Sequence, residues 1–436
     1  MEIDNTTYYD LSILNHEEEY AIIHRLDYCK SHGGSVKLQY LLTHPHKRIS
    51  EIRETQETIR QIMNVLDGWP TQISNGTLLV IEKFYAYHFD AIPNTHTPFQ
   101  ALSYRIFSNP DYSLAKYSLT HFCDFLQGMQ TLTALLRPQN SPLVAALLEK
   151  IDLHLKKEIL SQIIASKGKH IHDAAMLRYT HFLYNHFKEA ILTLIDAYHT
   201  LDAYYSMAMA VKTRNLHFPK IVEQETPFIQ AKQLYHLLLE HPTAYDVEML
   251  PENNFIFLTG ANMAGKSTFI KTIGVAVYLA HVGMGVPAAS MELSLFDGLL
   301  SNIQVQDNIV KGESYFFNEV QRIKNSILKI TDGRKWLVLI DELFKGTNVQ
   351  DAMQCSLTVV KGLLKIKNSV FVLSTHLYEI AAELKTYPNI AFRYFETDVN
   401  HEALHFSYQL REGVSNDRIG YLILKKEKVT DLLDRL

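Results

Sequence analysis

Leu258-Thr-Gly-Ala-Asn-Met-Ala-Gly-Lys-Ser-Thr268 is the stretch of sequence that decides the fold. Gly260 is followed by four residues and then by Gly-Lys-Ser ending at Ser267, which is the spacing of a phosphate-binding loop. The apolar run Phe255–Leu258 precedes the loop and predicts a buried strand, and Phe269–Leu279 predicts a helix behind it. The sequence therefore predicts a strand, a loop and a helix that together hold the phosphates of a nucleotide.

The glycines of this loop allow backbone N–H groups to curl around a phosphate at the N-terminus of a helix, where the helix dipole favours negative charge. We expect the Lys266 side chain to reach the β- and γ-phosphates and the Ser267 hydroxyl to be a ligand of Mg²⁺. The residues predicted to bind the nucleotide follow one another along the loop: Gly260, Ala261, Asn262, Met263, Ala264, Gly265, Lys266, Ser267 and Thr268.

Length and composition are those of an ordinary globular protein with a sizeable core. The 436 residues and 50.1 kDa predict two or three domains. The fractions of hydrophobic residues, 47%, and charged residues, 20%, are typical of a soluble chain. The net charge of −5 argues against a protein that coats nucleic acid by bulk electrostatics, although it leaves room for a local basic patch.

No feature of the sequence indicates export or membrane insertion. The segment Met1–Thr7 lacks the basic and apolar regions of a signal peptide. Thr272–Ala289 is as apolar as a membrane span, but it begins as the helix behind the phosphate loop, so we expect a core helix followed by a turn and a strand. The sequence thus predicts a cytoplasmic protein without a membrane segment. Neither a disulfide framework nor a zinc site is expected from the widely spaced cysteines Cys29, Cys123 and Cys355.

The first half of the chain has a helical pattern up to about residue 220. Ser141-Pro142 predicts the start of a helix that continues to about Ala165, because proline suits the first helical position. Asp173 begins an apparently unbroken helical run to about Arg214, which at 1.5 Å per residue would span about 60 Å. A helix of that length predicts a lever, a coiled coil or a scaffold. Two ordinary helices with a break near His199-Thr200 are the alternative.

After residue 220 the pattern changes to strands that alternate with helices. Trp336–Ile340 and Ser369–Leu373 are short apolar runs rich in strand-forming residues, and a helical stretch at about Gln350–Ile366 lies between them. This alternation predicts a mostly parallel sheet with helices on its faces. Near the end, Ala391–Thr397 and Leu404–Leu410 flank a polar turn and predict a hairpin added to the sheet.

Polar residues follow two of these predicted strands. Asp341 comes directly after the first strand, where an acid can hold the Mg²⁺ of a nucleotide, and the adjacent Glu342 is placed to orient or deprotonate the attacking water. His376, after the second strand, is placed to contact the γ-phosphate or that water. A purely structural role for this histidine, one of 21 in the chain, is the alternative. The predicted catalytic residues are Glu342 and His376, and the predicted metal ligands are Ser267 and Asp341.

The order of the motifs along the chain indicates which class of nucleotide-binding protein the sequence resembles. The phosphate loop, with an Asn262-Met263 pair that most such loops lack, resembles that of the MutS mismatch-repair family. Further motifs in that family's order are Gly312-x-Ser314-x-Phe316-x-x-Glu319, Asp341-Glu-Leu-Phe-Lys-Gly-Thr347 and Ser374-Thr-His376, with Gly413 and Gly420 near the end. The region around Gly34-Ser35 resembles, more weakly, the start of the family's helical core.

The resemblance implies a multidomain α and α/β protein. A helical core and lever domain would occupy residues 1–225, and an ABC-type ATPase domain with a phosphate-binding loop and a mostly parallel sheet would occupy residues 226–436. In such ATPases the helix after a Gly-x-Ser motif closes over the γ-phosphate held by the other subunit. The resemblance therefore implies ATP and Mg²⁺ as cofactors, DNA as a partner, a homodimer through the ATPase domains, and a role in trans for Ser314.

The chain also departs from the family's pattern. We expect a short member without the N-terminal mismatch-recognition domain, and we interpret Phe187-Lys-Glu189 as a coincidental match to its Phe-x-Glu wedge. Only Ser166–Ile171 joins the two predicted levers, which leaves little room for the family's clamp. The polar residues near this turn, which would contact phosphates or form a solvated loop, are Lys167, Lys169, His170 and His172. The other departures are Ala261, Ala264, Arg418-Ile419 and the lack of an evident dimerisation tail.

We therefore expect an ATP-dependent, DNA-associated protein whose dimer opens and closes and moves its helical levers. Branches, junctions or ends of DNA are more natural ligands than a single mismatch for a chain without the wedge. One alternative is a nucleotide-switched accessory protein that binds a protein partner, and another is a phosphotransferase, which would leave the Gly-x-Ser motif unexplained. Tyr245 and His241 are candidates for stacking on the adenine.

Overall fold

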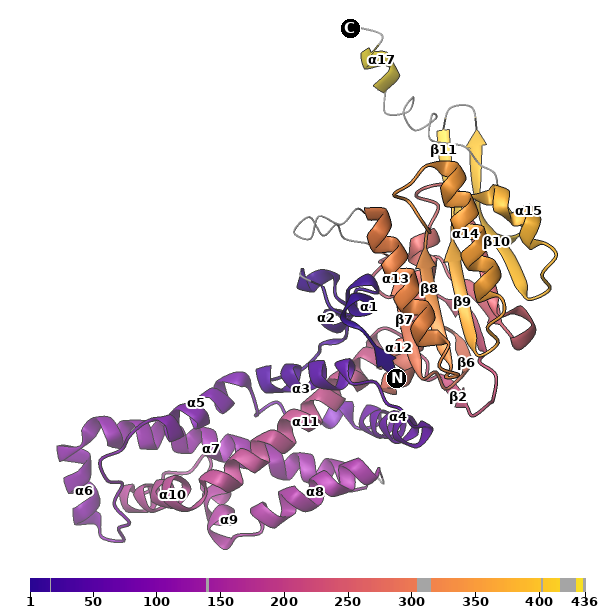
Figure 1. The fold of residues 1–436 in the computed structure, drawn as a ribbon. Helices are drawn as coiled ribbons and strands as arrows, with labels where there is room; N and C mark the ends of the chain where they lie inside the picture. The colour runs from indigo at the N-terminus through magenta and orange to yellow at the C-terminus, as the bar shows by residue number, and fades with distance from the viewer. Residues whose placement is uncertain (16, 139–140, 304–314, 401–402, 416–428, 434–436) are drawn as a thin grey trace. The chain divides into compact units, whose positions relative to one another are not determined.

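The computed structural model describes residues 1–15, 17–138, 141–303, 315–400, 403–415 and 429–433 (Figure 1). Its contacts group the chain into two compact units. The sheet unit comprises Met1–Arg25, His44–Arg53 and Arg214–Leu436, and the helical unit comprises Leu26–Thr43 and Glu54–Thr213. The sequence predicted a single boundary at residue 225, whereas the contacts assign two N-terminal segments to the C-terminal unit.

A sheet in the order β1-β7-β8-β9-β5-β10-β11 forms the centre of the sheet unit. All neighbouring strands run parallel except β10 and β11, which form an antiparallel hairpin. A smaller sheet has the order β2-β6-β3-β4. The strands are β1 (Glu2–Ile3), β2 (Lys220–Val222), β3 (Ile229–Leu234), β4 (Tyr245–Met249), β5 (Phe255–Thr259), β6 (Ser290–Ser294), β7 (Gly298–Asn302), β8 (Trp336–Asp341), β9 (Ser369–Ser374), β10 (Ile390–Asn400) and β11 (Ala403–Glu412).

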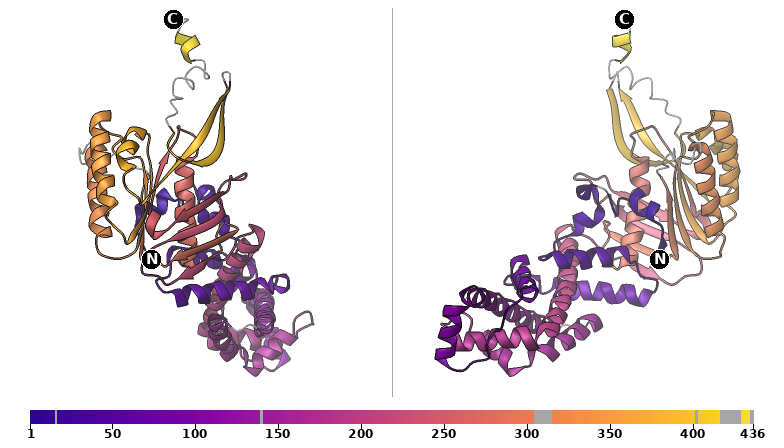
Figure 2. Two further views of the ribbon diagram at one scale, coloured as in Figure 1. Left: turned by 90° about the vertical axis from the view of Figure 1, so that its right-hand side faces the viewer. Right: turned by 60° about the vertical axis from the view of Figure 1, so that its left-hand side comes forward.

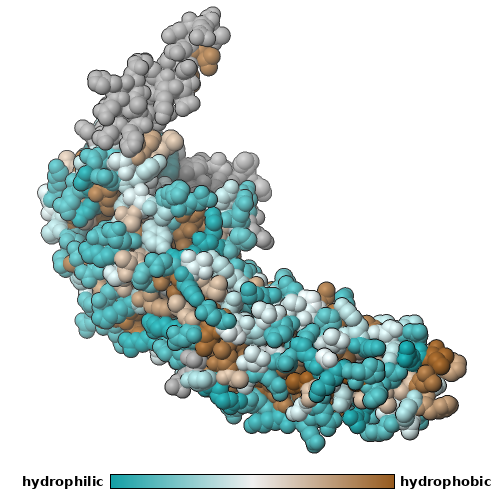
Figure 3. All heavy atoms as spheres, turned by 180° about the vertical axis from the view of Figure 1, so that it is seen from behind, coloured by the Kyte–Doolittle hydropathy of each residue, from teal (hydrophilic) through white to brown (hydrophobic). Residues whose placement is uncertain are grey.

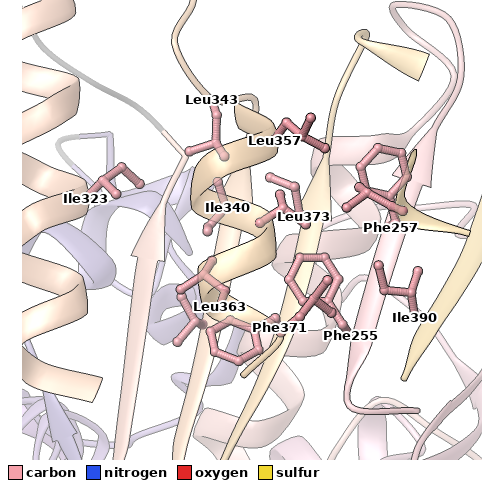
Figure 4. Close-up of a cluster of buried hydrophobic side chains, with 14 of the residues drawn as sticks. Phe255, Phe257, Ile323, Ile340, Leu343, Leu357, Leu363, Phe371, Leu373 and Ile390 are labelled. Carbon is pink, nitrogen blue, oxygen red and sulfur yellow. The ribbon is translucent and has the colours of Figure 1, made fainter. Parts of the chain in front are cut away.

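Helices cover both faces of the larger sheet, as Figure 2 shows. Strands β5, β8 and β9 are buried along their whole length, so they read as continuous apolar runs. One face carries a core into which Ile323 of α13 and Leu357 of α14 project (Figure 4). The helices of this unit are α1 (Asn5–Asp10), α2 (Ile22–Leu26), α12 (Lys266–Val282), α13 (Tyr315–Ile330), α14 (Val349–Leu363), α15 (Ala381–Leu384) and α17 (Val429–Leu433).

The elements predicted around the phosphate loop and in the sheet are confirmed. Strand β5 precedes the loop and α12 follows it, while β8, α14 and β9 alternate as expected and β10 pairs with β11 as a hairpin. The apolar segment Thr272–Ala289 is the end of α12, a left-handed turn at Gly283 with φ of 83°, and the approach to β6. In the part of the chain that the structure describes, no helix is both long and apolar enough to cross a membrane.

The helical unit is a bundle in which the long helices pack side by side. Helix α7 packs against α5, α8 and α10, and α11 packs against α3 and α8. Apolar side chains on α6 remain exposed and form a patch at one end of the unit (Figure 3). The helices are α3 (His32–Thr43), α4 (Ile49–Met63), which begins in the sheet unit, α5 (Asn75–Ala86), α6 (Pro98–Phe107), α7 (Asn109–Leu136), α8 (Pro142–Leu155), α9 (Glu158–Ala165), α10 (Asp173–His186) and α11 (Lys188–Thr213).

The single helix predicted over residues 173–214 is two helices, α10 and α11, which meet at Phe187 and not near His199-Thr200. The fully buried Phe187 ring stacks on Phe182 with 5.6 Å between ring centroids. Residues five apart in a continuous helix point about 140° away from each other, so a break is needed to bring the two rings together. The helix predicted over residues 141–165 is likewise divided, into α8 and α9, at the extended residue Lys157.

Candidate nucleotide-binding site

The phosphate loop joins the end of β5 to the start of α12. Gly260 and Gly265 have φ angles of 139° and 106°, in a region that residues with a β-carbon rarely adopt. Gly265 is the residue before the first helical residue, Lys266, so the free N–H groups of the helix face the loop. Met263, with φ of 67° and 71% exposure, lies at the outer side of the loop. The local sequence thus folds into an anion-binding turn.

The Lys266 ammonium folds back onto the loop. It donates hydrogen bonds to the carbonyl oxygens of Gly260, at 2.8 Å, and Ala261, at 3.0 Å. The residue is only 5% exposed, and burial lowers the pKa of its amino group to about 8. Two neutral carbonyls are weaker partners for a buried cation than an anion is. A phosphate in the loop would therefore attract this side chain away from the carbonyls.

Each carboxylate oxygen of Asp341 accepts a hydrogen bond from a serine hydroxyl. The Ser267 hydroxyl donates to Oδ2 and the Ser374 hydroxyl donates to Oδ1. Parallel pairing brings Asp341 of β8 opposite Ser374 of β9, because the carboxyl ends of parallel strands meet at one edge of the sheet. Asp341 is 7% exposed. A carboxylate and a hydroxyl are hard oxygen ligands, which fits a Mg²⁺ ion that keeps several waters and binds phosphate oxygens.

Each carboxylate oxygen of Glu342 has a close partner, a histidine ring nitrogen on one side and a lysine ammonium on the other. Oε1 lies 2.5 Å from Nε2 of His376, and Oε2 lies 3.2 Å from Nζ of Lys345. Burial acts to raise the pKa of Glu342, but the hydrogen bond from His376 and the charges of His376 and Lys345 outweigh it and lower this pKa to about 2. Glu342 itself has φ of 63°, and its N–H donates to the Ser374 carbonyl at 3.0 Å. The carboxylate is thus held ionised beside the phosphate loop.

A cavity of about 450 Å³ lies beside the loop. Tyr245 and His241, the two candidates for the adenine, line it together with Tyr408 of β11. The Tyr245 ring meets Phe269 and Phe395 edge to face, which fixes its orientation, whereas Tyr408 is 43% exposed. The predicted loop residues that line this cavity are Ala261, Asn262, Met263, Gly265, Lys266, Ser267 and Thr268.

The structure therefore brings most of the predicted site residues together. Ser267, Asp341, Glu342 and His376 form one connected set of contacts beside the loop. Ser314, Gly420 and the pair Arg418-Ile419 lie outside the described residues. Within the described ranges, no group of three or more His, Cys, Asp or Glu side chains is arranged to hold a metal ion on its own.

Three residues of the site were not singled out from the sequence. Lys345 lies within the Asp341–Thr347 motif, but its pairing with Glu342 depends on the turn after β8. Ser374 lies within the Ser-Thr-His motif, yet its bond to Asp341 follows from strand register. Tyr408 reaches the cavity only because the hairpin folds over the phosphate loop, which no local pattern indicates.

The polar turn between α9 and α10 lies in the helical unit. Lys167 is paired with Asp124 of α7 at 2.8 Å. Lys169 and His170 line a cavity of about 250 Å³ to which α7 also contributes Lys116. The Phe187-Lys-Glu189 match does not form an exposed wedge, because the Phe187 ring is fully buried.

Residues 256–431 match the family model described as MutS domain V. This match covers the phosphate loop, the carboxyl ends of β8 and β9, and the hairpin. This part of the chain belongs to the MutS family.

Proteins similar to this chain include the DNA mismatch repair protein MutS of Petrotoga mobilis, which is 28% identical over 228 residues, 52% of this chain and 28% of that protein. The DNA mismatch repair protein MSH3 of Vanderwaltozyma polyspora is 26% identical over 313 residues, 68% of this chain and 29% of that protein. The human MutS protein homolog 4 is 29% identical over 247 residues, 54% of this chain and 26% of that protein. The chain thus matches less than a third of the length of each of these relatives.

Proposed function

We propose that this protein binds ATP with Mg²⁺ and hydrolyses it, and that it uses the cycle to change the state of a homodimer on DNA. The observation that carries the proposal is the connected set of Ser267, Asp341, Glu342 and His376 beside a phosphate-binding loop. Asp341 and His376 come from neighbouring strand ends, and Ser267 comes from the first turn of α12. This combination supports hydrolysis of a nucleoside triphosphate better than simple nucleotide storage.

In the proposed reaction Lys266 leaves the carbonyls of Gly260 and Ala261 and binds the β- and γ-phosphates. Glu342, ionised at neutral pH because of its low pKa, orients a water by accepting its hydrogen bond. That water attacks the γ-phosphorus, the bond to the β,γ-bridging oxygen breaks, and the protons of the water pass to the products, phosphate and nucleoside diphosphate. His376 lies close enough to Glu342 to exchange this contact for one to the γ-phosphate or the water.

Ser267 and Asp341 are the residues that would hold Mg²⁺. A bound Mg²⁺ would neutralise charge on the β- and γ-phosphate oxygens. To bind it, the Ser267 and Ser374 hydroxyls must loosen their present bonds to Asp341. The adenine would occupy the outer part of the cavity, against Tyr408 and the segment that contains His241 and Tyr245.

DNA as the partner rests on the relatives, several of which are named as DNA mismatch repair proteins. We propose branched or otherwise structured DNA as the ligand, and the turn with Lys169 and His170 as one place of phosphate contact. The homodimer would form through the ATPase domains, with Ser314 acting on the nucleotide of the partner. The net charge of −5 favours the alternative of a nucleotide-switched protein that binds another protein.

The hydrolytic role is tested by Glu342→Gln, which keeps the shape of the side chain and removes its charge. We expect ATP turnover to fall by at least about a hundredfold while binding of a fluorescent ATP analogue is retained. Glu383→Gln is the matched control, because Glu383 is an exposed carboxylate of the same unit that pairs with Lys361. Undiminished turnover in Glu342→Gln would remove the assigned role of Glu342.

The DNA and dimer parts of the proposal need a second experiment. ATP turnover is measured with single-stranded, duplex, mismatched and branched DNA, and the mass of the protein is measured with and without ATP. We expect stimulation by branched DNA that declines steeply as salt rises, because phosphate contacts release counterions, and we expect ATP to double the mass. Binding to a protein partner with little salt dependence, and no response to DNA, would favour the accessory protein instead.

A further inference from the structure

Helix α13 holds a buried carboxylate against the loop that carries Glu342. Glu319 of this helix is 3% exposed. Its two oxygens accept hydrogen bonds from the backbone N–H groups of Lys345, at 3.2 Å, and Gly346, at 3.3 Å. Burial raises the pKa of Glu319, while these backbone N–H groups act against that rise. The carboxylate therefore acts as the hydrogen-bond acceptor for two backbone N–H groups of the loop after β8.

This arrangement is costly unless both hydrogen bonds are made. A buried carboxylate loses its hydration, and backbone N–H groups recover only part of that loss. A turn after a strand can satisfy its N–H groups with water or with its own side chains, as the exposed Asn348 does at the start of α14. The position of Glu319 thus indicates that the loop needs a fixed conformation.

The conformation that Glu319 holds is an unfavourable one. Glu342 and Phe344 have φ angles of 63° and 59°, where residues with a β-carbon are strained, and Phe344 is also 5% exposed. The Phe344 ring packs on Phe316 of the same helix α13, with 5.8 Å between centroids. Two contacts from one helix, a carboxylate and a ring, thus stabilise a loop that would relax without them.

The loop conformation decides where the catalytic carboxylate lies. Lys345, whose N–H is bonded to Glu319, reaches back with its ammonium to the Glu342 carboxylate. Helix α13 is in turn anchored at its middle, where Arg322 donates to the buried Asp10 carboxylate at 2.9 Å and to the Ser301 carbonyl at 2.9 Å. A chain of contacts therefore runs from the end of β7 through α13 to Glu342.

We propose that Glu319 is a positioning residue for the hydrolytic step, because its carboxylate holds the loop 342–346 in the strained conformation that aims Glu342 at the water. This inference rests on the proposed function, since it assigns a role in ATP hydrolysis. Glu319 is not among the residues that line the cavity beside the phosphate loop. It fixes the backbone from which Glu342 and Lys345 project, and its hydrogen bonds link that loop to α13, which follows the Gly312-x-Ser314 motif in the sequence.

The first test separates turnover from binding. In Glu319→Gln, one amide oxygen replaces two carboxylate oxygens, so one of the two N–H groups loses its acceptor. We expect kcat to fall by at least about tenfold and KM to change by less than about threefold, because a small misplacement of a catalytic group slows the chemistry more than it weakens binding. The kcat of Glu319→Ala should be lower still, whereas the kcat and KM of Glu383→Gln, a change at an exposed position, should equal those of the wild type.

The second test measures the loop itself by hydrogen exchange of a peptide that spans residues 341–348. We expect faster exchange of this peptide in Glu319→Gln, with the peptide that covers β8 unchanged. A wild-type kcat in Glu319→Gln, a loss of nucleotide binding in proportion to turnover, or faster exchange throughout the sheet unit would each overturn the inference. A wild type that hydrolyses no ATP would overturn the proposed function, whereas the exchange result would still report whether Glu319 holds the loop.

Discussion

His281 shows how a single buried residue makes the sheet unit sensitive to acid. It lies near the end of α12 with no exposed surface. Its Nδ1 lies 2.8 Å from the Val277 carbonyl and its Nε2 accepts from the Phe296 N–H at 2.9 Å, so the ring uses one donor and one acceptor. Burial lowers the pKa of His281 to about 4. The ring is therefore neutral in the folded protein at neutral pH.

We expect stability to fall as the pH is lowered from about 6.5 to about 4. In this window the histidine of the unfolded chain binds a proton that the folded chain does not, so acid favours unfolding, by about 3 kcal/mol over the whole window for His281. Urea unfolding at several pH values measures the slope. His281→Gln should flatten it, while His44→Gln, at an exposed histidine of the same unit, should not. Equal slopes in all three proteins would contradict this account.

At the scale of single elements, the packing of α3 against α11 depends on a glycine. A β-carbon on Gly34 would lie 2.1 Å from an oxygen of the Asp202 carboxylate. Asp202 is fully buried, and its carboxylate accepts from the N–H groups of Lys30 and Ser31 and from the Ser31 hydroxyl. The carboxylate cannot move away without losing these bonds at the start of α3.

Gly34→Ala is therefore expected to destabilise the helical unit by about 2–4 kcal/mol, through overpacking and a weakened helix start. Chemical denaturation, followed by hydrogen exchange of peptides from α3 and α11, measures the loss. Gly76→Ala in α5 is the matched control, because a β-carbon there meets only the Ser74 hydroxyl at 3.7 Å. The control should change stability by less than about 1 kcal/mol. Similar stabilities of the two variants would argue against the close approach.

At the scale of the whole molecule, the N-terminal segment is part of the sheet unit. Strand β1 pairs in parallel with β7, and Leu11 is fully buried. The Asp10 carboxylate accepts from the Ser301 hydroxyl at 2.6 Å, the Ile303 N–H at 3.0 Å and the Arg322 guanidinium at 2.9 Å. A C-terminal piece alone would lack an edge strand, a core residue and the acceptor for these three donors.

We expect residues 214–436, expressed alone, to be less stable than the same region of the full chain and prone to aggregation through the uncovered edge of β7. Urea unfolding and light scattering measure both properties. In the full chain, Asp10→Ala should cost about 3–5 kcal/mol, because it leaves the buried end of Arg322 without its carboxylate. A fragment with the unfolding midpoint of the full chain would show that the N-terminal segment is dispensable.

The sequence by itself determined the features that depend on neighbouring residues. The glycines of the phosphate loop, the apolar runs of β5, β8 and β9, and the acids at the end of β8 are local patterns, and local backbone geometry follows from them. Because parallel strands end at one edge of a sheet, the placement of Asp341 and His376 beside the loop could also be predicted. Their contacts with Ser267 and Glu342 in the structure agree with that expectation.

Only the tertiary structure decided the features that join distant residues. The break at Phe187 depends on its stacking with Phe182 in a buried core, and no proline or glycine marks it in the sequence. The assignment of residues 1–25 to the sheet unit depends on partners almost 300 positions away, such as Ser301 for Asp10. Glu319 belongs to a motif that the sequence shows, but its two backbone hydrogen-bond partners on the loop after β8 are seen only in the folded chain. Burial and hydrogen-bond partners are properties of the packed chain, and a local pattern does not contain them.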